Sequence, residues 1–336
     1  MRVLVLGATG FIGGAIAKRL AAEGHEVRAL CRDPSAFDGD ARRGDLGDPR
    51  SMADAAEGCS HVIHAAGIVA PDAHERALRW THVAGMENLL NACQHAGVKR
   101  LVHVTCTDVT LANHDRMHWD ELKPVPGEPY GARAKSLQLA EDLLLSATGV
   151  ETISIRAGWV WGPGDTSRLP GLLAEALDGG IRLVGSGRSY LSTTYIDHLV
   201  DTVVVALDAK DATGRAFHVI DPTFQHARDF FMALSEALEL PPPKETPPFA
   251  IAWPMARLRG GDAGVWLLQR GKNTLFDFSA ACGRLDYDPQ VQLEDGLTAL
   301  AEWVEAQGGV EAVSKWVEPP PDARSVDAQV EAAGGD

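Results

Sequence analysis

The feature that most constrains this chain is a glycine turn placed directly after its first apolar segment. The residues Val3-Leu4-Val5-Leu6 lead into Gly7-Ala8-Thr9-Gly10-Phe11-Ile12-Gly13, and a segment with helical periodicity follows to Ala22. A strand, a glycine turn and a helix in this order form the first unit of a dinucleotide-binding fold. Gly7 permits the tight turn, Gly10 lets the backbone approach a pyrophosphate, and Gly13 lets helix and strand pack closely. The helix N-terminus adds free N–H groups and a positive dipole, which favour a phosphate.

The alternation of strand and helix continues to about residue 221. Short β-branched runs predict strands at Arg2–Leu6, Glu26–Cys31, His61–Ala65, Arg100–Thr105, Glu151–Arg156 and Ala216–Ile220. Longer amphipathic segments predict helices at Phe11–Ala22, His74–Ala96, Lys135–Ser146 and Ile196–Leu207. This pattern is typical of an α/β protein with a doubly wound parallel (Rossmann) sheet that helices cover on both faces.

The pattern also predicts how the chain is divided. Residues 1–165, completed by 195–222, are expected to form the dinucleotide-binding core, and residues 166–194 and 223–316 a smaller mixed C-terminal lobe for the substrate. In this lobe the segment 225–238 predicts an amphipathic helix, and the Pro-rich segment 240–248 separates it from the apolar stretch 249–268. That stretch is either a helix that covers the core or a wall of an apolar substrate pocket. Residues 317–336, rich in Pro, Asp, Ala, Glu and Gly, are expected to be disordered.

The composition excludes several classes of partner. A formal net charge of −15 would repel a phosphate backbone or an anionic membrane surface, so we expect a small-molecule substrate and no nucleic acid. No run approaches the ~18 apolar residues of a membrane span. The five cysteines form no CxxC pair, and we interpret them as the reduced thiols of a cytoplasmic protein. The histidines show no metal-ligand spacing, so no metal is expected.

Further motifs, spread over most of the chain, define a resemblance to a known family. They are Gly44-Asp45-Leu46, His64-Ala65-Ala66-Gly67, the helical segment 83–90, the block 156–165, Thr194-Tyr195-Ile196-Asp197-His198 and Tyr287-Asp288-Pro289. Together with the GxxGxxG spacing of the first turn, they resemble the extended short-chain dehydrogenase/reductases of the NAD-dependent epimerase/dehydratase superfamily.

The resemblance implies a set of cofactor contacts. Asp45 would bind the adenine amino group, Leu46 would line the adenine pocket, and Ala65 and Ala66 would touch the cofactor ribose, with Gly67 beside them. The first turn would contact the cofactor through Gly7, Thr9, Gly10, Phe11, Ile12 and Gly13. Relatives usually form homodimers through the helices that correspond to His74–Ala96 and Lys135–Ser146.

The choice of dinucleotide depends on charge at the end of the second strand, where an acid binds a 2′-hydroxyl and an Arg meets a 2′-phosphate. Cys31 and Arg32 stand at this position, and Asp33 follows. NADP(H) is therefore favoured over NAD(H). The alternative is that Arg32 is a surface residue paired with Asp33 or Asp45.

The catalytic set that the resemblance implies departs from the family pattern. Relatives use a Tyr as general acid/base, a Lys four residues later that holds the nicotinamide ribose, and a Ser or Thr that binds the substrate oxygen. Thr107 matches the hydroxyl position, and Tyr130 and Lys135 match the pair, but with a spacing of five. On a regular helix this spacing separates the two side chains by roughly 140° rather than 40°. Because Lys135 keeps the family's distance from Arg156, the irregularity is expected on the Tyr side.

Three explanations of the displaced pair stay open. Tyr130 could lie just before the first helical turn and reach in from the loop, or the helix could begin with a one-residue bulge. The third explanation is that the general acid has been lost. A second departure is His82, which replaces an Asn of relatives and is expected to bond a backbone carbonyl.

The later motifs are most similar to the 3β-hydroxysteroid dehydrogenase group, which includes sterol-4-carboxylate 3-dehydrogenases and 2-alkyl-3-oxoalkanoate reductases. This similarity implies hydride transfer between nicotinamide and a secondary alcohol or ketone of an apolar, sterol-like or 3-oxo acid-like substrate. Two alternatives are a nucleotide-sugar epimerase or dehydratase, and a sensor or scaffold protein that holds the cofactor without turning it over.

Overall fold

The centre of the molecule is one parallel sheet. The computed structural model describes residues 1–70, 73–123, 128–259 and 263–317. The sheet has seven strands in the order β12-β7-β5-β4-β1-β2-β3, and every neighbouring pair is parallel. The strands are β1 (Arg2–Leu6), β2 (Glu26–Cys31), β3 (Asp40–Arg43), β4 (His61–His64), β5 (Arg100–Cys106), β7 (Glu151–Ala157) and β12 (Arg215–Val219).

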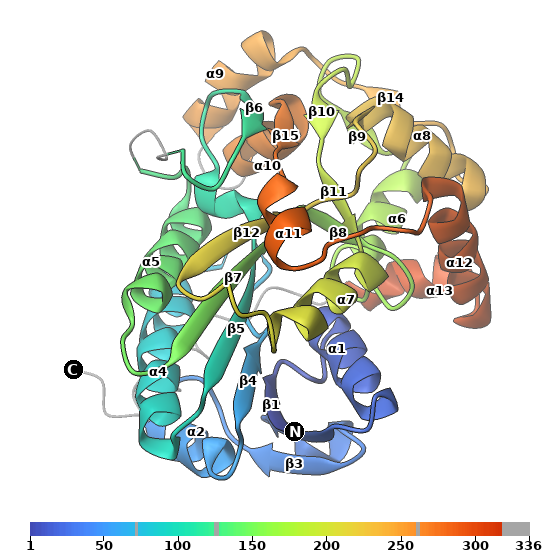
Figure 1. Ribbon diagram of the computed structural model, residues 1–336. Helices are drawn as coiled ribbons and strands as arrows, with labels where there is room; N and C mark the ends of the chain where they lie inside the picture. The colour runs from blue at the N-terminus through green and yellow to red at the C-terminus, as the bar shows by residue number, and fades with distance from the viewer. Residues whose placement is uncertain (71–72, 124–127, 260–262, 318–336) are drawn as a thin grey trace.

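Helices cover both faces of this sheet (Figure 1). Successive residues of a strand point to opposite faces, so Val3 and Val5 pack on one side of the sheet and Leu4 and Leu6 on the other. The first side is covered by α1 (Phe11–Ala22) and α7 (Ile196–Ala206), and the second by α2 (Pro49–Ala56), α4 (Gly85–Ala96) and α5 (Ala132–Ser146). The prediction of a doubly wound sheet is confirmed.

The helix predicted over His74–Ala96 forms with one irregular turn. Its first part is α3 (Glu75–Leu78), a π-helical segment follows at Arg79–Ala84, and α4 completes it. The helical path continues without a break, because Leu78, Ala84 and Gly85 all keep right-handed helical angles. A π-helical turn accommodates one extra residue, and such turns are frequent at functional sites.

Further elements gather beyond the carboxyl ends of the strands (Figure 1). They include four two-stranded sheets, which pair β6 (Arg116–Trp119) with β15 (Thr274–Phe276), β8 (Trp159–Trp161) with β11 (Thr193–Tyr195), β9 (Arg182–Leu183) with β14 (Lys244–Glu245), and β10 (Tyr190–Leu191) with β13 (Gln225–His226). The helices are α6 (Leu169–Leu177), α8 (Ala227–Ala237), α9 (Phe249–Arg259), α10 (Ala263–Gly271), α11 (Ser279–Arg284), α12 (Leu293–Ala306) and α13 (Val310–Val313).

The apolar stretch 249–268 forms parts of two helices, α9 and α10, rather than one. The division of the chain into a core and a lobe at residues 165, 195 and 222 stays a prediction. The predicted disordered tail lies, from residue 318 on, outside the described residues. None of the helices in the described part combines the length and apolar character that a membrane span requires.

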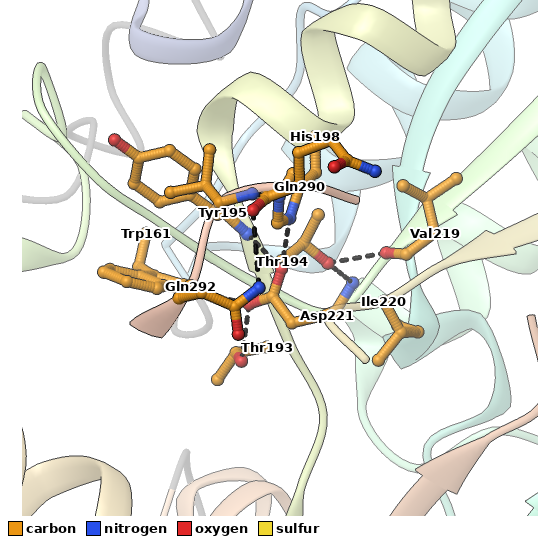
Figure 2. A network of polar contacts seen from close by, with 12 residues as sticks. Trp161, Thr193, Thr194, Tyr195, His198, Val219, Ile220, Asp221, Gln290 and Gln292 are labelled. Carbon is orange, nitrogen blue, oxygen red and sulfur yellow. Dashed lines mark hydrogen bonds and ion pairs between the residues drawn. The ribbon is translucent and has the colours of Figure 1, made fainter. Parts of the chain in front are cut away.

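A buried carboxylate joins these later elements to the sheet (Figure 2). Asp221, two residues after β12, accepts hydrogen bonds from the indole N–H of Trp161 at 2.9 Å and the hydroxyl of Thr193 at 2.8 Å. Its other oxygen accepts from the backbone N–H of Tyr195 at 2.8 Å and contacts Nδ1 of His198 at 2.9 Å. One side chain therefore links β8, β11, the start of α7 and the end of β12.

We expect Asp221→Asn to destabilise the fold by roughly 2–4 kcal/mol, because the amide has one acceptor oxygen and turns an N–H group toward buried donors. Urea unfolding measures the change in the free energy of unfolding. The matched control is Asp54→Asn, a change at an exposed position on α2. Equal stability of the two variants would contradict the role assigned to Asp221.

Candidate active site

The glycine turn between β1 and α1 forms a cradle that side chains would fill. Gly7 has a positive φ of 85°, and a Cβ there would lie 2.8 Å from the carbonyl oxygen of Ala65. A Cβ on Gly13 would lie 2.2 Å from the Gly7 carbonyl oxygen, so α1 packs directly on the turn. A Cβ on Gly10 would approach this oxygen only to 3.4 Å, and Gly10 is exposed. Gly7 and Gly13 therefore fix the turn, while Gly10 leaves its outer side open to a ligand.

The start of α1 is free for an anion. No side chain in the described part of the chain caps it, and its first turn holds no acidic residue, so the first N–H groups keep their partial positive charge. Thr9 is exposed and Phe11 and Ile12 are partly exposed beside these groups. The cradle and the open helix start fit the pyrophosphate of a dinucleotide. When bound, such a cofactor supplies a nicotinamide ring that gives or accepts a hydride.

The residues after β4 lie against this turn, where the strand order reverses between β4 and β1. The Ala65 N–H donates to the Leu6 carbonyl oxygen at 3.0 Å, and Ala66 and Gly67 follow as partly exposed and exposed residues. Ligands of open α/β sheets bind at this kind of switch point. The structure thus brings together the first turn and the residues predicted to line the cofactor ribose.

The loop after β3 has a fixed conformation. The Asp45 carboxylate accepts from the Gly47 N–H at 2.9 Å, and the Asn88 amide of α4 donates to the Leu46 carbonyl oxygen at 3.1 Å. Both Asp45 and Leu46 are partly exposed, as residues that line a ligand must be.

Arg32 lies exposed at the end of β2. Asp33 is engaged elsewhere, because its carboxylate accepts from the N–H of Ser35 at 3.1 Å and from its hydroxyl at 2.8 Å. Among the described residues, neither Asp33 nor Asp45 pairs with Arg32. Arg43, at the end of β3, lies opposite Cys31 in the sheet register, so two arginines stand at neighbouring strand ends.

Tyr130 and Lys135 point to different surroundings. Tyr130 precedes α5, its N–H donates to the Leu111 carbonyl oxygen at 2.7 Å, and its ring centre lies 5.2 Å from that of Trp253 on α9. Lys135 is 47% exposed, and its Nζ lies 2.7 Å from a carboxylate oxygen of Glu128, which raises the pKa of Lys135. Among the described residues the structure shows no contact between Tyr130 and Lys135.

The helix start decides between two of the explanations for the spacing. Gly131 caps α5 with a positive φ of 89°, and the first helical bond runs from the Lys135 N–H to the Gly131 carbonyl oxygen at 3.2 Å. The helix is therefore regular from its beginning and contains no bulge. Tyr130 lies before the first turn, as the first explanation expects.

The side chain of this segment that reaches the strand ends is Arg133, which the sequence analysis did not single out. Its Nε donates to the Ile68 carbonyl oxygen at 3.1 Å, and its Nη1 donates to the Asp108 carboxylate at 2.8 Å. Its Nη2 lies 3.6 Å from the sulfur of Cys106 at the end of β5. Only 13% of the Arg133 side chain is exposed.

The register of α5 explains why Arg133, and not Lys135, faces inward. Glu141 of α5 is buried and accepts from the Ser154 hydroxyl at 2.6 Å and from Arg156 at 2.9 Å, both on β7. Arg133 and Leu137 precede Glu141 by eight and four residues and share its face, whereas Lys135 is rotated by roughly 160° from Leu137. The spacing of Arg133 to Glu141 is the signal that could have identified it.

Thr107 opens the 3-10 turn Thr107–Thr110 directly after β5 and is partly exposed. Next to it, the Asp108 carboxylate accepts from Arg133 and, at 2.8 Å, from the Gln269 amide of α10. This carboxylate therefore ties the end of the sheet to the apolar helices beyond it.

His82, inside the π-helical segment, is linked to Arg133 by hydrogen bonds through Ser136. The backbone N–H of Ile68 donates to its Nε2 at 3.1 Å, so its Nδ1 carries the proton and donates to the Ser136 hydroxyl at 2.8 Å. Ser136 in turn donates to the Arg133 carbonyl oxygen at 2.8 Å. The expected bond from His82 to a backbone carbonyl is wrong, because His82 accepts a backbone N–H instead.

The sequence of this chain matches a family model over most of the sheet. The matching model is that of the NAD dependent epimerase/dehydratase family, over residues 3–219. The chain belongs to this family. The predicted resemblance is confirmed, and the NAD dependence in the family's description supports a nicotinamide dinucleotide as the cofactor type.

Similar proteins extend this finding over nearly the whole chain. A 2-alkyl-3-oxoalkanoate reductase of Stenotrophomonas maltophilia is 29% identical and covers 89% of this chain and 98% of its own length. A 3 beta-hydroxysteroid dehydrogenase/Delta 5-->4-isomerase of Mycobacterium tuberculosis is 27% identical over 82% of this chain and 77% of its own length. The UDP-glucose 4-epimerase of Thermotoga maritima shares the fold, with a TM-score of 0.76 at 18% identity over 91% of this chain and 99% of its own.

Behind the site of this epimerase/dehydratase family member lie buried histidines that stay neutral. Burial lowers the pKa of His103 to about 4 and that of His82 to about 3, and on β12 it lowers the pKa of His218 to about 3. In the unfolded chain these rings titrate near the ordinary value of about 6.5. The unfolded state therefore binds more protons below that pH.

We expect the free energy of unfolding to be highest above about pH 6.5 and to fall as the pH drops toward 4, by roughly 1.4 kcal/mol per pH unit for each buried histidine. Urea unfolding between pH 7 and pH 5 measures this slope. His103→Gln should lower the slope by about one histidine's share, while His95→Gln, at an exposed position on α4, is the control. A slope that His103→Gln leaves unchanged would contradict the assignment.

Proposed function

We propose that the protein is an NAD(P)-dependent oxidoreductase that transfers a hydride between nicotinamide and a secondary alcohol or ketone of an apolar substrate. The observation that carries this proposal is the glycine cradle with the uncapped α1, within a chain whose relatives are named reductases and dehydrogenases. Among those names are a 2-alkyl-3-oxoalkanoate reductase and 3β-hydroxysteroid dehydrogenases, which supports a 3-oxo acid-like or sterol-like substrate.

An apolar substrate is also supported by the surroundings of Tyr130. Phe249 and Trp253 of α9 and Val265 of α10 pack in one cluster with Tyr130 and the buried Leu111. These helices therefore offer an apolar wall beside the end of β5. The alternative function, a nucleotide-sugar epimerase or dehydratase, is supported by solved structures of similar fold that have these activities.

For the proton transfer we propose Tyr130 as general acid/base, with Thr107 polarising the substrate oxygen and Lys135 holding the nicotinamide ribose. This role requires Lys135 to exchange Glu128 for the cofactor. A second candidate function is a protein that holds the dinucleotide without turning it over. It is favoured by the Lys135–Glu128 ion pair and by Arg133 occupying the inward face of α5.

We also propose that the cofactor is NADP(H). Support comes from the exposed Arg32, which no described carboxylate engages, and from Arg43 on the neighbouring strand end. A homodimer through α4 and α5 and a location in the cytoplasm complete the proposal. Leu139, exposed on α5, supports the first, and five free cysteines support the second.

We expect the protein to bind NADPH more tightly than NADH, because an Arg and a 2′-phosphate form a charge-assisted pair. Arg32→Ala should weaken NADPH roughly 10- to 100-fold and leave NADH nearly unchanged. Calorimetric titration measures both affinities, and Arg50→Ala, an exposed Arg on α2, is the control. Equal affinities in the parent protein would show that the 2′-phosphate assignment is wrong.

Turnover tests the function, with 3-oxo acids, sterols and nucleotide sugars as substrates. We expect turnover of an apolar substrate, and Tyr130→Phe should lower kcat by about two orders of magnitude with little change in cofactor affinity. Tyr190→Phe, which leaves the α5 segment intact, is the control. Turnover confined to nucleotide sugars would favour the epimerase alternative. Cofactor binding without any turnover would favour the protein that holds the dinucleotide without using it. Full activity of Tyr130→Phe would show that another group donates the proton.

A further inference from the structure

Arg168 is held in place at the edge of the site, between β8 and α6. Its backbone N–H donates to the buried carboxylate of Asp165 at 2.9 Å, and that carboxylate also accepts the N–H groups of Ser167 and Leu169. Its guanidinium carbon lies 4.9 Å from the ring centre of Trp159. When a guanidinium lies on an aromatic ring, its flat face makes the contact and the N–H donors at its edge stay free. Two of these N–H groups can then bind the two oxygens of a carboxylate.

Arg168 forms no ion pair within the described ranges, whereas three other arginines of this region do. Arg133 is paired with Asp108 at 2.8 Å, and Arg182 and Arg270 share Glu175 at 3.1 Å. Within the described ranges, no carboxylate forms an ion pair with Arg168, and its side chain is only partly buried. Because the guanidinium is accessible and has no ion pair, it can attract an anionic ligand even though the net charge of the chain is −15.

The position of Arg168 points to the substrate side of the site. The guanidinium of Arg270 on α10 also lies over Trp159, at 5.5 Å, and the adjacent Gln269 donates to Asp108 directly after β5 at 2.8 Å. Trp159 therefore connects Arg168 to the helix that contacts the end of β5. Burial alone would raise the pKa of Asp108, but the charge of Arg168 helps to lower it. The same loop borders the cofactor turn, since a Cβ on Gly164 would lie 3.5 Å from Phe11. The loop that holds Arg168 therefore borders the cofactor turn at one end, and Arg168 lies at its other end, next to Trp159.

We propose that Arg168, stacked on Trp159, binds a carboxylate of the substrate and so selects an apolar carboxylic acid over neutral substrates of the same length. A guanidinium fork that no described carboxylate engages suits one carboxylate. Arg133, Arg182 and Arg270 are each already bonded to Asp108 or Glu175. The proposal deepens the proposed function, because it names the substrate class of that site.

The test compares decanoate with decanamide, two probes of equal chain length that differ in charge, by calorimetry on the NADPH-loaded protein. We expect the parent protein to prefer decanoate. Arg168→Gln should remove this preference, with decanoate binding at least about tenfold weaker and decanamide unchanged. The matched control is Arg182→Gln, because Arg182 also lies over an indole, Trp266 at 5.5 Å, but is paired with Glu175. This control should keep the preference.

Several results would overturn the proposal. One is a parent protein that does not prefer decanoate, and another is an Arg168→Gln variant that keeps the preference. If Arg168→Gln weakens NADPH instead, the anion that Arg168 meets is a cofactor phosphate. Should Arg168→Gln fail to fold, Arg168→Lys keeps the charge without the fork and should bind decanoate several-fold more weakly than the parent protein. Unchanged decanoate affinity in Arg168→Lys would overturn the carboxylate assignment. Because decanoate is not turned over, this test measures carboxylate binding even if the protein has no reductase activity. A lack of reductase activity would contradict the proposed function but not the role of Arg168.

Discussion

The bonds to the Asp221 carboxylate hold together the elements beside which we propose that the substrate binds. The sheet repeats one βα pattern, in which apolar side chains of the strands pack against the covering helices. The later elements lack this repeat, and a buried charge with four donors specifies one arrangement where an apolar contact would allow several. Trp161 and Thr193 bring β8 and β11 to the end of β12 through this carboxylate. The positions of Trp159 and Arg168, which follow from β8 and the loop after it, depend on the same bonds.

The sequence was sufficient to predict most of the sheet and the cofactor turn. Strands and helices of the core alternate with clear periodicity, and Gly7 and Gly13 are required by sterics that any chain entering this turn must meet. Such local constraints can be recognised from residue type and spacing alone. Inside the core, β3 and α2 were not among the predicted elements. The π-helical turn at Arg79–Ala84 was also missed, because the apolar pattern does not show that this turn contains one residue more than an α-helical turn.

The segment with Tyr130 and Lys135 was less predictable, because the orientation of a helix depends on contacts far away in the sequence. The distance in sequence from Arg156 predicted that Lys135 would take the position of the family's Lys. In the structure the buried ion pair of Glu141 with Arg156 sets the rotation of α5 and turns Arg133 inward. The role of Arg168 was also hidden. Arg168 lacks an ion pair because Asp108 and Glu175 pair with Arg133 and Arg270 instead. The spacing of residues in the sequence does not show which carboxylate pairs with which arginine.

The π-helical segment Arg79–Ala84 makes the length of this part of the chain significant. Because a π-helical turn absorbs one extra residue locally, deleting one residue here would restore a regular α-helix and leave Ala77 and Leu78 facing the interior. The change would fall on the π-helical segment itself, where His82 bonds Ser136. A single-residue gap at this place in an aligned relative therefore marks a regular helix with the same buried residues in α3, and not a rotated one.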